Sequence, residues 1–407
     1  MRVLRGQGRV WAALVAGFLL GAVTLGVLDR VTAGGAAPDD LETFRAAYDL
    51  IRARYVDAEQ AESATLVRDA IEGMVNGLGD TGHSRYLTAE QRQREQQQLS
   101  GRFVGVGVEL AERDGRTVIV AAIPGSPAAE AKLRAGDRFL TIEGEDVSTL
   151  PLAEFRSRIR GPKGSSFRAT ILQADGVTRA LTLAREEIRT PFVSWAPVEG
   201  SGIWHIRISQ FGRDTAEELG RALKPAEAQG ATGIVLDLRD NPGGLLDEAV
   251  GVVSRFVPAG VVLVERGRDG TTEPTSVKKG TSATTLPVVV LINGGSASSS
   301  EVVTAALLYH ERAVAIGATT FGTATVLRPF ELPDGSVLLL GVEEWLTPAG
   351  EPLRRQGVTP TEAVSLEREA RPLLPRRPDS PAEQPCASDD AQLRAAVARL
   401  GSACPAA

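Results

Sequence analysis

The chain has 407 residues, of which 43% are hydrophobic, 24% charged and 5% aromatic. These proportions suit a globular protein with a large core, and they exclude a chain disordered throughout, a collagen and a small disulfide-stapled protein. The length predicts roughly two or three domains. The formal net charge of −6 argues against a nucleic-acid partner, because neutralising phosphates requires a basic surface.

The first 33 residues contain a candidate membrane segment. An uncharged run at residues 10–28 follows three arginines and is long enough, as a helix, to cross the hydrocarbon core of a bilayer. The position of the arginines predicts a cytoplasmic N-terminus and an exported remainder, on the periplasmic or cell-surface side. Small residues at 31–33 also fit a signal-peptide cleavage site, so a cleaved signal is the alternative to an anchor.

Residues 34–100 predict a helical segment. Apolar side chains recur at spacings of three and four over residues 41–55 and again over residues 66–78, where Gly79 ends the second pattern. Both stretches are typical of amphipathic helices.

Residues 101–187 consist of short strand-like runs separated by glycine and proline, which predicts a compact, mostly β domain. Val106, Gly107 and Val108 form a glycine-containing turn that enters a strand. Such a turn can present backbone N–H groups to a carboxylate while the strand edge pairs with an extended peptide, so we expect peptide binding here. A dinucleotide-binding turn is the competing interpretation, but the third glycine and the following helix are missing.

Residues 188–368 alternate between strands and helices, which predicts a core with a parallel or mixed sheet. The expected fold class is therefore an α/β (α+β) core with an inserted mostly-β domain and an N-terminal helical segment. Residues 369–407 read as a linker rich in proline, arginine and glutamate, followed by a C-terminal helix.

The two cysteines, Cys386 and Cys404, lie near the C-terminus on either side of a short helical pattern. Outside the cytoplasm they can pair, and closing a loop of this length would stabilise the fold by about 3 kcal/mol. Two free surface thiols are the alternative. Their spacing, without clustered histidines, does not fit a zinc site, and we expect no metal.

Two motifs of the core point to chemistry. Residues 237–244 follow a strand and end in Gly243 and Gly244, which allow a tight turn with outward-facing amides. Such amides can form half of an oxyanion hole, although a plain strand-to-helix turn is the alternative.

The second motif, at residues 293–301, reads Asn-Gly-Gly-Ser-Ala-Ser-Ser-Ser-Glu between a strand and a helical pattern. A serine at such a turn lies at the positive end of the helix dipole, where its neighbour's amide can receive an oxyanion. A capping box with Glu301 explains one serine and not four.

These motifs resemble those of C-terminal processing peptidases, or tail-specific proteases, which are exported serine proteases with an inserted PDZ domain. The resemblance covers residues 40–365 and includes the runs at 80–87 and 332–336. It implies that Ser298 is the nucleophile and that the amides of Ser299 and of Gly243 or Gly244 form the oxyanion hole. It further implies that the ligands are C-terminal tails of envelope proteins and that no cofactor is needed.

The catalytic base of this family is a lysine in a Thr-Phe-Gly-Lys-Gly-x-Val-Gln motif. Here the corresponding run begins at Thr320, and Thr323 replaces the lysine while Leu327 replaces the glutamine that assists it. A threonine hydroxyl does not accept a proton at neutral pH, and loss of a base lowers the rate by about 10⁴-fold or more. The chain has five lysines, none of them at this position: Lys132, Lys163, Lys224, Lys278 and Lys279.

The substitution predicts impaired or lost activity and leaves three interpretations. The chain is a pseudo-protease that binds peptides as a scaffold or as a regulator of an active paralogue. Alternatively it cleaves slowly, with His83, His205 or His310, or a lysine of a partner chain in a homo-oligomer, as the base. A different hydrolytic chemistry is the third. Arg328 is no substitute, because a guanidinium stays protonated.

Overall fold

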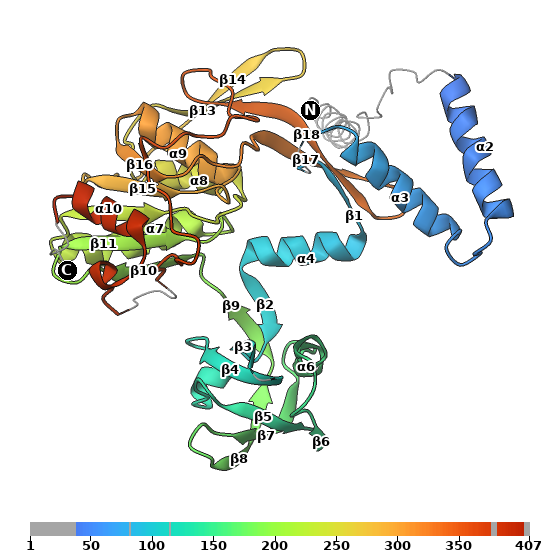
Figure 1. The fold of residues 1–407 in the computed structure, drawn as a ribbon, viewed down its shortest axis with the longest axis horizontal. Helices are drawn as coiled ribbons and strands as arrows, with labels where there is room; N and C mark the ends of the chain where they lie inside the picture. The colour runs from blue at the N-terminus through green and yellow to red at the C-terminus, as the bar shows by residue number, and fades with distance from the viewer. Residues whose placement is uncertain (1–37, 81–82, 114, 376–380, 403–407) are drawn as a thin grey trace, which may run out of the picture. The chain divides into compact units, whose positions relative to one another are not determined.

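The computed structural model describes residues 38–80, 83–113, 115–375 and 381–402 (Figure 1). The candidate membrane segment at residues 10–28 and Cys404 lie outside these ranges. Among the described helices, none combines the length and the apolar character needed to cross a membrane. Residues up to Met74 belong to one compact unit and residues from Val75 onward to another.

The N-terminal helical segment contains the two helices expected from the apolar spacing. Helix α2 spans Pro38–Arg54 and α3 spans Ser63–Asn76. The hydroxyls of Tyr48 and Ser63 form a hydrogen bond of 2.5 Å, which ties α2 to the start of α3.

Helix α4, Ala89–Ser100, follows the short strand β1, Arg85–Leu87. It is polar on every side, so no apolar periodicity predicts it. A capping box fixes its start: the Gln91 N–H donates to Thr88 Oγ1 at 3.2 Å, and the Thr88 N–H donates to Gln91 Oε1 at 2.8 Å.

The inserted β domain begins and ends on neighbouring strands, because β2, Arg102–Gly105, pairs antiparallel with β9, Glu186–Arg189. A hairpin of β3 and β4 and a four-stranded sheet in the order β6-β5-β7-β8 lie between them. Phe139 and Phe155 lie in its buried apolar cluster. The remaining bounds are β3 Val108–Arg113, β4 Arg116–Ala122, α5 Pro127–Glu130, β5 Arg138–Ile142, β6 Glu145–Asp146, α6 Leu152–Ile159, β7 Ser166–Leu172 and β8 Thr178–Ala184.

The core is built on a six-stranded mixed sheet in the order β10-β11-β12-β15-β16-β19, in which only the β10 pairing is antiparallel. This confirms the α/β class expected from the alternation of strands and helices. The strands are β10 Val193–Pro197, β11 Ile203–Ile208, β12 Gly233–Asp237, β15 Val288–Ile292, β16 Ala313–Gly317 and β19 Glu362–Ala363. The helices are α7 Thr215–Ala228, α8 Leu246–Val253, α9 Ser299–Tyr309 and α10 Ala391–Arg399.

Both faces of this sheet are covered, which explains why its central strands are apolar at every position. On β15, Val288, Val290 and Ile292 pack in the cluster that contains residues of α7, α8 and α9. The alternate residues Val289 and Leu291 pack in a second cluster with α10. The C-terminal helix is therefore part of the core.

A second, antiparallel sheet has the order β1-β18-β13-β14, with β17 added beside β18. The sequence pattern did not predict β17, because Pro329 interrupts it. Proline is tolerated in edge strands, and β17 pairs only with β18 among the described strands. The bounds are β13 Val261–Gly267, β14 Thr272–Ser276, β17 Thr325–Glu331 and β18 Val337–Leu346.

The stretch read as a linker is partly built into the core. Glu383 forms a parallel β-bridge with Val198, and a short 3₁₀ helix, η1, follows at Pro385–Ala387. Asp390 is fully buried and caps α10. Cys386 is disulfide-bonded, in agreement with the pairing considered from the sequence.

We predict that replacing Leu393 with alanine destabilises the core, because this side chain of α10 is fully buried against the sheet. Deleting a buried leucine side chain typically costs about 2–5 kcal/mol. Urea unfolding followed by tryptophan fluorescence measures the loss, with the exposed Arg399→Ala on the same helix as the control. Equal unfolding midpoints for the two variants would show that α10 is not part of the core.

Candidate active site

Ser298 lies between β15 and α9 with φ 55° and ψ −118°. A residue with a Cβ adopts positive φ only when the surrounding structure imposes it. Because Ser298 immediately precedes α9, it lies at the positive end of that helix dipole. A strained serine between a strand and a helix is the arrangement of a nucleophile elbow, the role that the resemblance implies for Ser298.

The buried carboxylate of Glu301 holds this strained turn in place. Its Oε2 accepts the backbone N–H of Ser298 at 2.8 Å and that of Thr323 at 3.0 Å. Its Oε1 accepts the Thr320 hydroxyl at 2.5 Å and the Gly322 N–H at 2.7 Å. One carboxylate therefore joins the serine turn to the 320–323 loop.

Burial raises the pKa of Glu301 above its usual value, and the hydrogen bonds from Thr320 and the backbone only partly offset this. Sequence reasoning had assigned Glu301 to helix capping alone. The spacing of three residues between Ser298 and Glu301 indicated the capping bond. It did not indicate the donors from Thr320, Gly322 and Thr323.

The glycine turn, residues 240–244, lies directly against Ser298. A Cβ at Gly243 would lie 2.7 Å from the Cβ of Ser298 and 3.0 Å from the Ser299 nitrogen. Gly243 and Gly244 have φ of 97° and 142°, so the turn requires glycine at both positions. The structure thus brings together the two motifs that the sequence singled out.

Hydrogen bonds lock the two turns together. The Asp240 N–H donates to Asn293 Oδ1 and the Asn293 amide donates to Asp240 Oδ1, both at 2.9 Å. The Asn241 carbonyl accepts the Ser300 hydroxyl at 2.9 Å. The hydroxyls of Ser296 and Ser299 likewise donate to backbone carbonyls, those of Leu238 and Gly244. Three of the four clustered serines therefore donate to backbone carbonyls, two of them in the glycine turn and one at Leu238, two residues before it.

A cavity of about 780 Å³ opens in front of Ser298. Its lining is apolar on the side of β17 and β18 and polar along α4. Residues at its Ser298 end and along β17 and β18 include Ser298, Gly243, Gly244, Thr325, Val326, Leu327 and Trp345, and His83 also lines it. The size and the mixed lining suit a stretch of polypeptide.

His83 is held in this cavity by Thr325, whose Oγ1 lies 2.5 Å from His83 Nδ1. Burial lowers the pKa of His83 below its usual value, the charge of Arg85 adds to this, and Asp80 partly opposes it. The imidazole is therefore neutral at neutral pH, as a general base must be.

The other two histidines do not line this cavity, although all three belong to the described part of the chain. His205 is fully buried in the core sheet between Asp237 and Glu383. His310 Nε2 lies 2.8 Å from the Val261 carbonyl oxygen, with which it forms a hydrogen bond.

Thr323, at the position of the family's lysine, is buried beside a narrow recess that also contacts Asp80 and His83. It is not among the residues that line the Ser298 cavity, whereas Leu327 is. The base side of the site thus has an apolar side chain at the position of the assisting glutamine.

The turn expected to bind a peptide terminus joins β2 to β3. Val106 is buried, and Gly107 has φ 79°, with a would-be Cβ only 2.1 Å from the Cβ of Ser126. Ser126 Oγ also donates to the Gly107 carbonyl at 3.2 Å. Val108 begins β3, so the turn leads into a strand as the sequence indicated.

Comparison with known proteins gives two family matches and several related proteins. Residues 202–364 match the model "Peptidase family S41", and residues 118–173 match "PDZ domain". The carboxy-terminal processing protease CtpA of Bacillus subtilis is 32% identical over 321 residues, 79% of this chain and 68% of that protein. The carboxyl-terminal-processing protease of Synechocystis is 34% identical over 306 residues, 72% of this chain and 70% of that protein.

Solved structures similar to this chain include the photosystem II D1 C-terminal processing protease. It is 26% identical to this chain, with a TM-score of 0.45, over 81% of this chain and 94% of that one.

Replacing Glu301 with glutamine is expected to loosen the 320–323 loop, because the amide's NH₂ would face backbone donors that now share a carboxylate oxygen. Leaving a buried donor unpaired costs about 1–3 kcal/mol. Hydrogen exchange should therefore be about tenfold faster or more at Gly322 and Thr323. The exposed Glu311→Gln, just beyond α9, is the control. Unchanged exchange in Glu301→Gln would contradict the role given to this carboxylate.

Proposed function

Because this chain belongs to the carboxy-terminal processing protease family, we propose that it is an exported serine peptidase that captures the C-terminal tails of other proteins and cleaves them at Ser298. The observation that carries this proposal is the strained Ser298 turn packed against Gly243 at the end of a peptide-sized cavity. The disulfide at Cys386 supports export, since such bonds persist in oxidising compartments.

The proposed first step is attack of the Ser298 hydroxyl on the scissile carbonyl. The carbonyl oxygen becomes an oxyanion that accepts the backbone N–H groups of Ser299 and of the glycine turn. The Gly243 N–H already donates to Asn241 Oδ1 at 2.9 Å, which favours Gly244 as the second donor. The PDZ turn at 106–108 would hold the substrate's terminal carboxylate, with the peptide added as a strand beside β3.

We assign the base to His83 in place of the family's lysine. With its proton on Nδ1, His83 donates to Thr325 Oγ1 and leaves the Nε2 lone pair to accept the proton of Ser298. The resulting imidazolium then protonates the leaving amine as the C–N bond breaks and the acyl-enzyme forms. Water, deprotonated by the same nitrogen, attacks the ester and releases the new C-terminus.

A peptide-binding scaffold is the second candidate function, and the substitutions at Thr323 and Leu327 favour it. The PDZ turn and the cavity would then hold a tail without cleaving it. The chain would act as a scaffold or as a regulator of an active paralogue. A homo-oligomer that supplied a lysine to this site would be a further source of activity.

We predict that the full-length protein in detergent cleaves a loosely folded substrate with an apolar C-terminal tail, and that Ser298→Ala abolishes cleavage. His83→Gln should lower kcat about 10⁴-fold or more, as expected when a catalytic base is lost. His310→Gln is the matched control and should retain activity, because His310 lies outside the cavity.

Cleavage by His83→Gln at the normal rate would refute His83 as the base and point to a lysine from a partner chain. Tail binding without cleavage by the native protein would establish the scaffold. If cleavage then appeared only in the Thr323→Lys, Leu327→Gln double variant, the groove would be intact and the base alone missing.

The pH profile gives a second prediction. Because the pKa of His83 is lowered from its usual 6.5, the neutral base should persist in more acidic solution than a free histidine would. We expect kcat/KM to fall with a midpoint below pH 6.5 as His83 becomes protonated. A midpoint near the much higher pKa of a lysine would contradict the assignment.

A further inference from the structure

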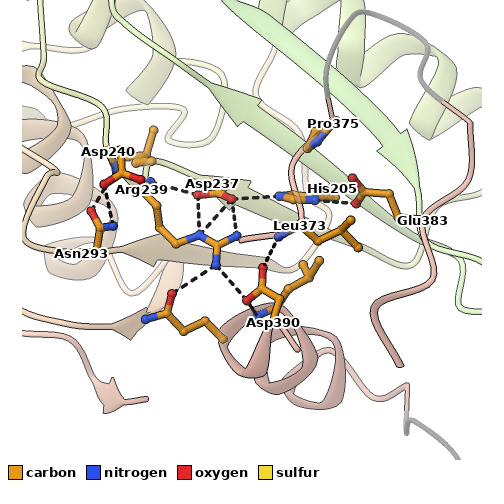
Figure 2. Close-up of polar contacts among 12 residues, drawn as sticks. His205, Asp237, Arg239, Asp240, Asn293, Leu373, Pro375, Glu383 and Asp390 are labelled. Carbon is orange, nitrogen blue, oxygen red and sulfur yellow. Dashed lines mark hydrogen bonds and ion pairs between the residues drawn. The ribbon is translucent and has the colours of Figure 1, made fainter. Parts of the chain in front are cut away.

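A cluster of charged side chains is buried at the end of β12 (Figure 2), and none of its members lines the Ser298 cavity. His205 of β11 and Asp237 of β12 belong to it, together with Arg239 in the turn after β12. Glu383 and Asp390 reach it from the C-terminal segment, which we define as residues 381–402. All five side chains are at most 8% exposed.

Arg239 is the centre of the cluster. Its Nε and Nη2 donate to the Asp237 carboxylate, the Nη2 contact measuring 2.6 Å. Its Nη1 donates to Asp390 Oδ1 at 2.9 Å and to Gln392 Oε1 at 3.1 Å. Two of its three carboxylate and amide partners therefore come from the C-terminal segment.

Asp390 has more than one function in this arrangement. Besides Arg239, its Oδ1 accepts the Leu393 N–H at 3.0 Å, which caps α10. Its Oδ2 accepts the Leu373 N–H at 2.8 Å. The same carboxylate thus binds the backbone of Leu373, caps the start of α10 and pairs with the buried guanidinium of Arg239.

His205 forms the second link between the sheet and the C-terminal segment. Figure 2 shows its ring between two carboxylates, with Nδ1 2.6 Å from Glu383 Oε2 and Nε2 3.1 Å from Asp237 Oδ2. Burial alone would lower the pKa of His205, but the bonds to Asp237 and Glu383 outweigh it and raise the pKa to about 9.

Among the residues that the structure describes, two charged side chains bind His205. Asp237 faces it from β12, Glu383 faces it from the C-terminal segment, and Arg239 lies beyond Asp237. The neighbouring strand on the other side, β10, contains no titratable residue.

The cluster is continuous with the active site through the backbone. Arg239 directly precedes Asp240, which exchanges two hydrogen bonds with Asn293 at the start of the serine turn. Asp240 has φ 55°, so the chain leaves the cluster in a strained conformation that neighbouring contacts must maintain.

We propose that the C-terminal segment is a positioning device for the active site: Asp390 and Glu383, by binding Arg239 and His205, hold the end of β12 and so the glycine turn against Ser298. The effect on catalysis rests on the proposed function, whereas the effect on the turn does not. Asp390 and Glu383 are positioning residues, because they act through Arg239 and His205 and do not contact the cavity.

The first test compares Asp390→Asn with the matched control Asp389→Asn, an exposed neighbour of identical chemistry, in the full-length protein. Hydrogen exchange at pH 7 is measured for peptides covering residues 238–246. In Asp390→Asn we expect residues 238–246 to exchange about tenfold faster, or more, than in the native protein. In Asp389→Asn we expect no change. The PDZ domain, which lies in a separate apolar cluster, should be unaffected by either.

The result that would overturn the proposal is faster exchange in the C-terminal segment of Asp390→Asn while residues 238–246 exchange as in the native protein. In that case the segment would be packed on the core without holding the turn. Hydrogen exchange does not depend on cleavage, so this outcome is distinct from a failure of the proposed function. If cleavage is present, kcat should fall in Asp390→Asn with KM nearly unchanged, since the substrate-binding residues are intact.

A second variant keeps the test valid if Asp390→Asn fails to fold. Glu383→Gln retains a hydrogen-bond acceptor for His205 but removes one negative charge, and exposed Glu369→Gln is its control. NMR of the labelled imidazoles follows the protonation of His205. The chain has three histidines, and the signal that is lost in His205→Gln is that of His205.

The sign of the pH effect follows from the raised pKa of His205. Its charge stabilises the docked segment fully below pH 6.5, and this contribution is lost as the pH rises through about 9. Trypsin cleavage after Arg394 of α10 should accelerate over that upper range in the native protein, and at lower pH in Glu383→Gln. Trypsin cleavage with the same pH profile in both proteins would contradict the role of the His205–Glu383 pair.

Discussion

The Glu301 carboxylate is the interaction on which the geometry of the site depends. A buried carboxylate is tolerated only when donors replace its water shell, and here four do so, from Ser298, Thr320, Gly322 and Thr323. Those bonds hold Ser298 at φ 55°, a conformation it would otherwise leave. They also fix the 320–323 loop, and β17 begins with Thr325 just beyond it. One acidic group thus positions Ser298 and the loop that leads to Thr325, the residue bound to His83.

A second buried charge system directly precedes the glycine turn in the chain. Burying the Arg239 guanidinium requires compensating carboxylates. Asp237 supplies one of the two that it binds, and Asp390 supplies the other. Removing a partner from such a system typically costs about 3–5 kcal/mol, because the remaining charge stays buried. The C-terminal segment supplies the second of these carboxylates, that of Asp390, so we expect the core sheet to lose stability without it. Since Arg239 adjoins the glycine turn, the same requirement connects the end of the chain to the catalytic geometry.

Much of the fold was predictable, because the apolar strands and the periodic helices carry strong patterns. The resemblance to C-terminal processing peptidases is confirmed, with the PDZ domain and the mixed α/β core. Helix α4 was missed because it is polar all round, and β17 because of Pro329. The structural environments of His205 and Asp390 could not be foreseen, since their partners lie far away in sequence. The contact between His83 and Thr325 joins residues 242 positions apart, so no local spacing indicated it.

The substitution at Thr323 removes the family's base, but the imidazole of His83, whose pKa is lowered by burial, lines the same cavity as Ser298. The central claim is that this pair makes Ser298 nucleophilic. The most direct test is labelling of the full-length protein with a fluorophosphonate, with the modified residue located by mass spectrometry. The account predicts an adduct on Ser298 that forms about 10²-fold or more slowly in His83→Gln. An unmodified Ser298 in the native protein, or equal labelling rates in the two proteins, would contradict it.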